Sequence, residues 1–536
     1  MKKKILLFCV LLILTLIGCA KRGSISGGLK DTIAPVLKVS FPKNYTTDFK
    51  GKTIKLSFDE YVKLKNVDKQ LIISPPLTKR PQILPVTASK SITIHFLDSL
   101  QTNTTYSLNF GQSIEDNNEG NPYRQFKYVF STGKFIDSLS LSGTIKDAHL
   151  KKTDAFVNVM LYEINDKYTD SIVYKENPRY ITNTLDSAAS FKLDHLKAGK
   201  YVLVALKDLN NDTKFNPKTE KIGFRKQYIT LPNDSLFEID LFKEKAAFKA
   251  LKPSQTAGNI ITVGYEGSPK EAQFNLKMGS KNLNAIVTQV PKKDSLQLWY
   301  QPIKMEKTAV DSLQLSVSKE KYHQDFNFKI KNQKVDSLKI TAIQISVLPL
   351  GERFTLNATL PLTKIDVSKI QLISKDSTSI PFKTEYDDLN LALKFDFQKE
   401  PLEKYKLKLL PGALTDYLGA TTDTIAFKFE TNNSSDYGNL RLNLENVKQF
   451  PIIIELTDKN GDVQLTSYSE NSTQIDFNAI KPDLYTLRVV YDENKNKVWD
   501  PGSFLEKRQS EEVLYFPKDI DVRANWDVQQ TFNLKK

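Results

Sequence analysis

Apolar and polar residues alternate along most of the chain. In residues 54–58, 92–96, 326–330 and 440–444 every second residue is Ile, Leu or Phe. Such a period of two is typical of antiparallel strands with one buried and one solvated face. Asn, Asp, Gly and Pro separate the runs, as they do in β-sandwiches. No long amphipathic helix stands out, and the best candidate is the weakly periodic segment 242–251. We therefore predict an all-β protein, a multidomain array of antiparallel β-sandwiches.

Two parts of this pattern occur twice, in the same order. The Asn- and Asp-rich segment 208–217 matches 492–501 at a constant offset of 284 residues. A second set repeats at an offset of 299, pairing Tyr106 with Tyr405 and Phe130 with Phe429. Such long-range duplication is typical of extracytoplasmic binding arrays rather than of one integrated catalytic domain. We expect the two Asn-rich segments to occupy the same strand connection in two similar sandwiches.

Residues 1–18 have the pattern of a lipoprotein signal peptide. Three lysines precede an apolar run that is shorter than the roughly 20 residues needed to span a bilayer. Leu16-Ile17-Gly18-Cys19 matches a lipobox, in which the thiol of Cys19 takes the diacylglycerol. The alternative is an ordinary secretory signal with a chance cysteine. Residues 19–34 are rich in Gly and Ser and predict a flexible tether.

Cysteine content and net charge limit the classes of protein to which this chain can belong. The two cysteines, Cys9 and Cys19, both lie in the signal region, so the mature chain has no disulfide and depends on hydrophobic cores. The net charge is +14, which raises the question of nucleic acid. However, lysines alternate with aspartates, and no dense basic block follows Lys21-Arg22. We therefore expect no nucleic-acid partner, and attraction to anionic lipid or polysaccharide is a secondary alternative.

Two stretches resemble a known bacterial domain. Phe58-Asp-Glu-Tyr-Val62, Tyr106-Ser-Leu-Asn-Phe110 and Phe130-Ser-Thr-Gly133 carry the resemblance. On these motifs residues 35–134 resemble an SbsA-type bacterial Ig-like domain. Residues 341–432 resemble a second, divergent copy that lacks the Phe-Asp-Glu motif. The resemblance implies an Ig-like β-sandwich in each stretch.

Two further stretches resemble accessory modules of another type. Leu196-Lys-Ala-Gly-Lys-Tyr201 and Ile480-Lys-Pro-Asp-Leu-Tyr485 each precede a strand. Through them residues 138–242 and 437–536 resemble prealbumin-like, carboxypeptidase-regulatory-type sandwiches. Residues 244–340 match no named domain and are predicted to form a further β domain. As a whole the chain resembles Ig-like-domain lipoproteins of Gram-negative outer membranes.

The first Asn-rich segment is a candidate calcium loop. Asp208, Asn210 and Asp212 have the one-three-five spacing at which oxygen ligands can wrap a hard cation. Residues 492–500 offer a similar set. Neither loop has Gly at the sixth or Glu at the twelfth position, so neither is an EF-hand. A looser calcium site and a hydrogen-bonded Asx turn both fit the pattern, and calcium is the single cofactor that it suggests.

Catalytic patterns are missing from the sequence. The four histidines are far apart, and there is no His-Glu-x-x-His, Gly-x-Ser-x-Gly or phosphate-binding loop. Asp59 and Glu60 are adjacent carboxylates, but neighbours on a strand point to opposite faces. Among the tryptophans, Trp526 lies on the apolar side of an alternation and is predicted to be core. Trp499 lies in a turn and either plugs a core or is exposed.

These observations favour a non-enzymatic protein. We expect an outer-membrane lipoprotein, anchored through Cys19, whose sandwich array binds or scaffolds an envelope or extracellular polymer or protein. Ala20 follows the cysteine and the acidic cluster linked to surface export is missing, so we expect the periplasmic face. The alternative is a hydrolase acting on envelope polysaccharide, with a catalytic site in residues 244–340 or between domains.

Overall fold

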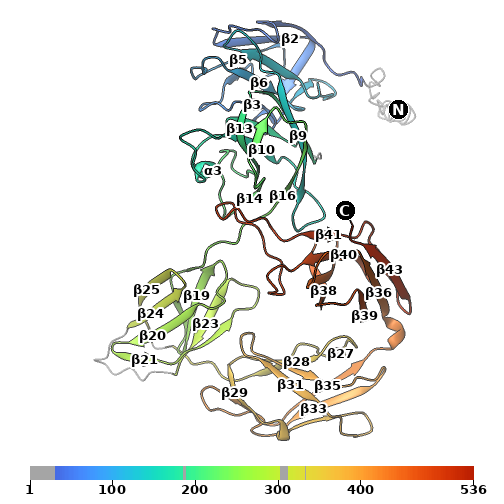
Figure 1. The fold of residues 1–536 in the computed structure, drawn as a ribbon. Helices are drawn as coiled ribbons and strands as arrows, with labels where there is room; N and C mark the ends of the chain where they lie inside the picture. Colours follow the sequence, from blue (N-terminus) through green and yellow to red (C-terminus); the bar gives the residue numbers. More distant parts are fainter. Residues whose placement is uncertain (1–30, 185–188, 302–311, 332, 536) are drawn as a thin grey trace, which may run out of the picture. The chain divides into compact units, whose positions relative to one another are not determined.

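The protein is built almost entirely of strands (Figure 1). The computed structural model describes residues 31–184, 189–301, 312–331 and 333–535, so the predicted signal peptide and Cys19 lie outside the described residues. The helices among them are short: α2 (Val67–Gln70), α3 (Ile172–Lys175) and two 3-10 turns. No helix in these ranges is long and apolar enough to cross a membrane. The predicted all-β array of antiparallel sandwiches is confirmed.

The chain divides into two compact units. Among the described residues, the first comprises 31–140, 179–184 and 193–198, and the second comprises 141–178, 189–192 and the residues from 199 onward. This division is coarser than the five sandwiches expected from the sequence. The sheets are therefore described one sandwich at a time.

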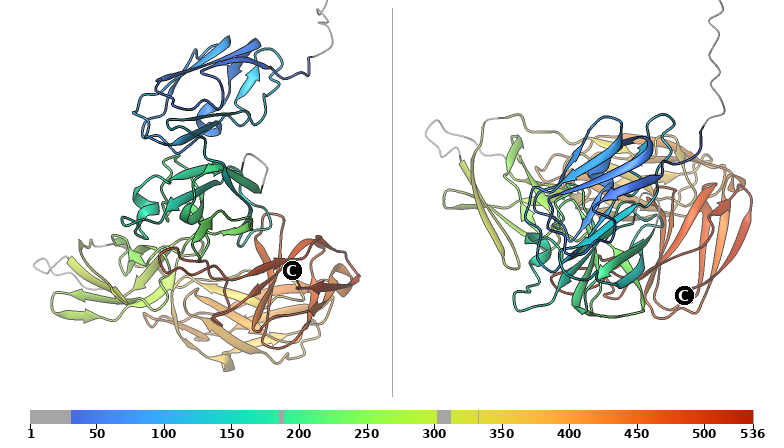
Figure 2. Two further views of the ribbon diagram at one scale, coloured as in Figure 1. Left: turned by 45° about the horizontal axis from the view of Figure 1, so that its top comes forward. Right: turned by 90° about the horizontal axis from the view of Figure 1, so that it is seen from above.

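The first sandwich has its two layers of strands drawn in blue in Figure 2. One sheet has the order β1 (Leu37–Phe41), β2 (Thr53–Leu64), β5 (Ser89–His95) and β4 (Gln82–Leu84), with β7 (Ile114–Asp116) also on β2. The other contains β3 (Ile72–Ser74), β6 (Thr105–Asn109) and β8 (Lys127–Ser131). Ile54, Leu56 and Phe58 are buried, as their alternation predicts.

A second sandwich is formed between residues 139 and 241. Its larger sheet has the order β11 (Tyr180–Asn183), β10 (Asn158–Glu163), β13 (Gly199–Lys207) and β14 (Lys221–Phe224), and β15 (Ile229–Leu231) also pairs with β13. Its smaller sheet contains β12 (Ser190–Leu196), β9 (Leu139–Asp147) and β16 (Leu236–Leu241). β9 and β16 run parallel, so the first and last strands of this sandwich lie side by side.

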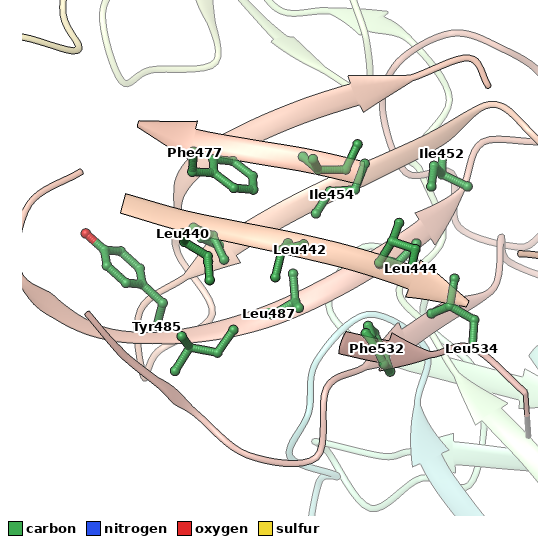
Figure 3. Packing of buried hydrophobic residues seen from close by; sticks show 14 of the residues in the cluster. Leu440, Leu442, Leu444, Ile452, Ile454, Phe477, Tyr485, Leu487, Phe532 and Leu534 are labelled. Atoms are coloured by element: carbon green, nitrogen blue, oxygen red, sulfur yellow. The ribbon is translucent and has the colours of Figure 1, made fainter. Parts of the chain in front are cut away.

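The last sandwich has the same strand order. One sheet is β38 (Val463–Ser469), β37 (Ile452–Thr457), β40 (Asp483–Tyr491) and β41 (Val513–Tyr515), with β42 (Ile520–Val522) on β40. The other is β39 (Gln474–Ile480), β36 (Gly438–Glu445) and β43 (Asp527–Asn533), and β36 and β43 are again parallel. Figure 3 shows the Leu side chains of β36 packed against those of the facing sheet, including Ile454 and Leu487.

The duplication holds residue by residue. Val204 pairs with Phe224 in the second sandwich, and Arg488 pairs with Tyr515 in the last. The offset between the copies is 284 residues before the Asn-rich loop and 291 after it. The second loop is therefore longer by seven residues. Both loops join equivalent strands, β13 to β14 and β40 to β41, as the duplication predicts.

Residues 249–330 form another sandwich. One sheet contains β17 (Lys249–Ala250), β19 (Ile260–Glu266), β23 (Ser295–Trp299) and β22 (Ile286–Gln289), with β18 (Ser254–Ala257) on β19. The other contains β21 (Lys281–Leu283), β20 (Gln273–Met278), β24 (Ser312–Lys319) and β25 (Tyr322–Lys329). The helix considered for 242–251 is wrong. Phe242 makes two backbone hydrogen bonds to Ile222, and the segment contains no helical turn.

The fourth sandwich repeats the first in its pairings. One sheet has the order β26 (Ile340–Ala342), β28 (Phe354–Ala358), β32 (Ala392–Asp396) and β31 (Lys383–Asp387). The other has the order β27 (Val347–Leu348), β35 (Ile425–Thr431), β33 (Lys404–Leu409) and β30 (Ile370–Ile373). A separate pair joins β29 (Leu362–Ile365) to β34 (Leu414–Asp416). Tyr106 faces Phe130 across β6 and β8, and Tyr405 faces Phe429 across β33 and β35. The repeat at an offset of 299 therefore reflects equivalent strand pairs.

Candidate functional site: two Asx-rich loops

The first Asx-rich loop, residues 208–220, is organised around Asp208. One carboxylate oxygen of Asp208 accepts the N–H of Asn211 at 2.6 Å. The other accepts the N–H of Thr213 at 2.9 Å and the side-chain amide of Asn158 at 3.3 Å. These bonds fold the chain into a tight turn directly after β13. Most of the oxygen lone pairs of Asp208 are therefore already used inside the protein.

Asn210 and Asp212 lie on the exposed side of the same loop. The Asn210 amide donates to Asp212 at 3.0 Å, and the Asp212 N–H donates back to the Asn210 carbonyl oxygen at 3.1 Å. Asp212 also accepts the N–H of Lys214 at 2.8 Å. The structure thus brings the predicted calcium ligands together, but as a hydrogen-bonded Asx turn. The calcium site stays a prediction.

Glu220 lies one residue beyond the twelfth position of the first loop, and the sequence does not predict its burial. Its side chain is buried, at 1% exposed. Its two carboxylate oxygens accept the N–H groups of Leu209 and Asn216, each at 2.9 Å. A buried carboxylate needs such partners, and here it joins the start of the loop to its end. Nothing in the alternation of apolar residues marks this position as buried.

The second Asx-rich loop, residues 492–511, is built in the same way. Asp492 accepts the N–H groups of Asn496 at 3.1 Å and Lys497 at 2.9 Å. Glu511 takes the place of Glu220 and accepts the N–H groups of Glu493 and Asp500, each at 2.9 Å. Burial, together with the nearby charges of Asp500 and Asp492, raises the pKa of Glu511. The backbone is left-handed at corresponding positions of the two loops: Asn211 and Thr213, Lys495 and Lys497.

Asp500 distinguishes the second loop from the first. It accepts the side-chain amides of Asn494 at 2.6 Å and Asn496 at 2.5 Å and forms an ion pair with Lys245. Burial opposes ionisation of this carboxyl, but the hydrogen bonds from Lys245, Asn494 and Asn496 lower its pKa. The protein's own ammonium group, on Lys245, therefore neutralises this largely buried carboxylate. Asn216, the counterpart of Asp500, is an uncharged amide.

The other candidate catalytic or metal-binding residues do not form a cluster in the described residues. Across the described ranges, no three His, Cys, Asp or Glu side chains lie close enough together to hold a metal ion. Asp59 accepts the N–H of Val36 at 2.8 Å, a bond that lowers the pKa of its carboxyl. Burial, with the charges of Asp116 and Asp59, raises the pKa of Glu60. The two adjacent carboxylates of β2 thus have different environments.

The tryptophans require one correction. Trp526 was expected in the core, but its side chain is 52% exposed. Asn525 has a φ of 61°, so the chain turns there and the alternation of β42 ends before Trp526. Trp499 is half-buried and donates its indole N–H to the Glu511 carbonyl at 3.1 Å. Trp299 is buried and donates to Thr288 at 2.8 Å.

Comparison with known proteins supports the fold. A family model described as bacterial Ig-like domain matches residues 31–132. No curated protein matches the chain. Similar solved structures include the surface layer protein SbsC, domains 1–6, at 10% identity and a TM-score of 0.15, over 91% of this chain and 67% of that one.

Two further structural neighbours are an I-band fragment of titin and an ICAM-5 ectodomain fragment. The titin fragment is 10% identical with a TM-score of 0.13, and the match covers 53% of this chain and 98% of that one. The ICAM-5 fragment is 10% identical with a TM-score of 0.13, over 73% and 98% of the two chains. At these scores and identities the similarities carry no argument about function.

Proposed function

We propose that this protein is a non-enzymatic lipoprotein of the outer membrane. Its sandwich array binds or scaffolds an envelope or extracellular polymer or protein. The observation that carries the proposal is the duplication: an Ig-like sandwich and a second type of sandwich each occur twice in one chain. Arrays of this kind present repeated, rigid surfaces to extended partners. The match of residues 31–132 to a bacterial Ig-like domain supports the same role.

We infer that the second and last sandwiches are the prealbumin-like, carboxypeptidase-regulatory-type modules that their sequences resemble. Their shared strand order and their parallel first and last strands support this inference. Such modules are accessory sandwiches, and the zinc ligands of the peptidases lie elsewhere. The resemblance therefore adds a binding or spacing role and no catalytic one.

The anchor is the second part of the proposal. The lipobox Leu16-Ile17-Gly18-Cys19 supports export, cleavage before Cys19 and acylation of its thiol. Two or more acyl chains hold a protein firmly where a single chain gives reversible binding. Ala20 supports the outer membrane, and the sequence after it supports the periplasmic face. The array would then project from the membrane on the tether of residues 19–34.

A co-sedimentation assay with a chemical readout tests the binding role. The acylated protein, purified in detergent, is mixed with isolated cell-wall and polysaccharide fractions, and both retention and newly formed reducing ends are measured. We expect retention on at least one fraction with no increase in reducing ends. Release of reducing ends would instead favour the polysaccharide hydrolase. Failure to sediment with any fraction would contradict binding to an envelope polymer.

A further inference from the structure

The extra seven residues of the second Asx-rich loop form a hairpin that reaches the second sandwich. Phe504, at its tip, is fully buried, although it lies outside the core cluster of its own sandwich. Its ring packs edge-on against Phe224 of β14, with 5.2 Å between the ring centres. The first loop is shorter by these residues and has no counterpart to Phe504. The insertion therefore carries the apolar contact.

Polar contacts fix the hairpin in place. The N–H of Phe504 donates to Glu244 at 2.5 Å, and the Gln509 amide donates to the Phe224 carbonyl at 3.0 Å. Lys507 forms an ion pair with Asp170 at 2.7 Å. These contacts involve backbone and side-chain groups on both sides, so the hairpin is fixed in one orientation.

The approach is too close for any side chain at Gly502. A Cβ atom there would lie 2.4 Å from the ring of Phe242 and 2.6 Å from the Arg508 carbonyl oxygen. Real Cβ atoms do not approach other atoms so closely. Glycine at this position thus allows the hairpin to lie against the second sandwich.

A second group of contacts involves β40 and β41. Arg488, which is 1% exposed, donates to the His149 carbonyl oxygen at 2.9 Å and to Glu455 at 2.6 Å. The Tyr515 hydroxyl donates to the same carbonyl at 2.5 Å. The His149 ring stacks on Trp499 with ring centres 4.2 Å apart and planes 12° apart. A buried guanidinium requires these partners.

We propose that the hairpin around Phe504 is an intramolecular clasp that holds the two duplicated sandwiches, residues 139–241 and 438–534, together as one rigid body. The two sandwiches are separated by the 196 residues of segment 242–437, so chain continuity does not bring them together and the contacts must do so. An interface with a buried aromatic anchor, satisfied polar groups and a buried guanidinium resembles a permanent one. The partner of this surface is therefore another module of the same chain.

A distance measurement in the full mature chain tests the clasp. Single cysteines replace the exposed Lys226 and Glu470, one on each sandwich, and are spin-labelled. The acylated Cys19 does not react. We expect one narrow distance distribution for the parent, and loss of that narrow peak in Phe504→Ala. Leu505→Ala is the matched control, because Leu505 is the next residue of the hairpin and is 57% exposed; it should keep the narrow peak.

A loop-shortened variant guards against misfolding. It deletes seven residues from 501–509, so that the second loop has the same length as the first. Its circular dichroism spectrum, compared with that of the parent, shows whether the sandwiches still fold. We expect it to lose the narrow peak as Phe504→Ala does. A broad distribution in the parent, or a narrow peak that survives both changes, would overturn the proposal.

Discussion

Single carboxylates determine how the two Asx-rich loops differ in their affinity for cations. In the first loop the oxygens of Asp208 and Glu220 already accept backbone N–H groups, and Asp212 retains free lone pairs on the exposed side. In the second loop Asp500 already has an ammonium partner in Lys245. Ligand charge and rigidity set the affinity of such loops. We therefore predict that the first loop is the better cation site, and a weak one.

We expect calcium to bind the first loop with a Kd of about 1 mM or weaker and to leave the second loop unoccupied. At five times the Kd the cation would stabilise the module by about 1 kcal/mol. Calcium titration of the mature chain, followed by melting temperature, measures this. Asp212→Asn should abolish the shift, whereas Asp500→Asn should keep it. An unchanged melting temperature in the parent would leave both loops as hydrogen-bonded turns.

The surroundings of His149 predict that the contact between the duplicated sandwiches is sensitive to acid. Burial, reinforced by the charges of Arg488 and Lys221, lowers the pKa of His149 to about 4. An imidazole released to solvent has a pKa of about 6.5. A histidine with a lowered pKa contributes stability that is fully present above 6.5 and is lost as the pH falls toward 4.

We therefore expect the contact to weaken between pH 6.5 and pH 4. The charged groups facing His149 include Arg488, Lys221 with its partners Asp147 and Asp154, and Glu455. Lys221 forms ion pairs with both aspartates, and Arg488 forms one with Glu455. The label-to-label distance distribution, measured from pH 7 to pH 5, should broaden in the parent. It should broaden less in His149→Phe, which keeps a ring to stack on Trp499. Equal broadening in both would assign the acid sensitivity to another group.

At the scale of elements, each of the two Ig-like sandwiches has an equivalent tyrosine that holds the loop preceding its own strand. Tyr106 on β6 accepts the N–H of Gln101 at 2.9 Å, and Tyr405 on β33 accepts the N–H of Glu400 at 2.8 Å. The tyrosine rings stack on Phe130 and Phe429, with centres 5.3 and 5.6 Å apart. Each buried ring thus holds the loop that leads into its own strand.

Removing the hydroxyl should weaken the first sandwich. We expect Tyr106→Phe to cost about 1 kcal/mol, because the ring stays packed and one hydrogen bond is lost. Exchange of the amide protons of β6 and β8 reports the opening free energy of this sandwich. Tyr61→Phe is the control, since the Tyr61 side chain is 57% exposed. Equal exchange in both variants would show that the bond contributes nothing.

Strands were predictable from the sequence because a strand with one buried face has an apolar residue at every second position. The alternation at residues 54–58 and 440–444 predicts β2 and β36. The equivalence of the copies also follows from sequence, since loop-forming residues recur at fixed offsets. The prediction for Trp526 is wrong because β42 already ends at Val522 and the chain turns at Asn525, which has a left-handed backbone. The burial of Glu220 was not predictable, because it depends on backbone N–H groups that the alternation does not reveal.

Contacts between modules that are distant in the chain could not be predicted from the sequence either. Phe504 lies in a polar segment, and nothing around it indicates that its partner is Phe224. The copies nevertheless contain the clue, because the insertion that carries Phe504 is present in one of them and missing from the other. Comparison of duplicated modules therefore points to residues that serve contacts outside their own sandwich.

At the scale of the whole molecule, the proposed membrane anchor depends on one thiol, that of Cys19. Cys19→Ala removes the acyl acceptor and with it the anchor, so we expect the protein to appear as uncleaved precursor or in the soluble periplasmic fraction. Fractionation of cells, followed by detection of the protein in each fraction, measures this. Cys9→Ala is the matched control, because Cys9 lies in the apolar part of the signal and is removed with it. Continued fractionation of Cys19→Ala with the outer membrane would refute the lipid anchor.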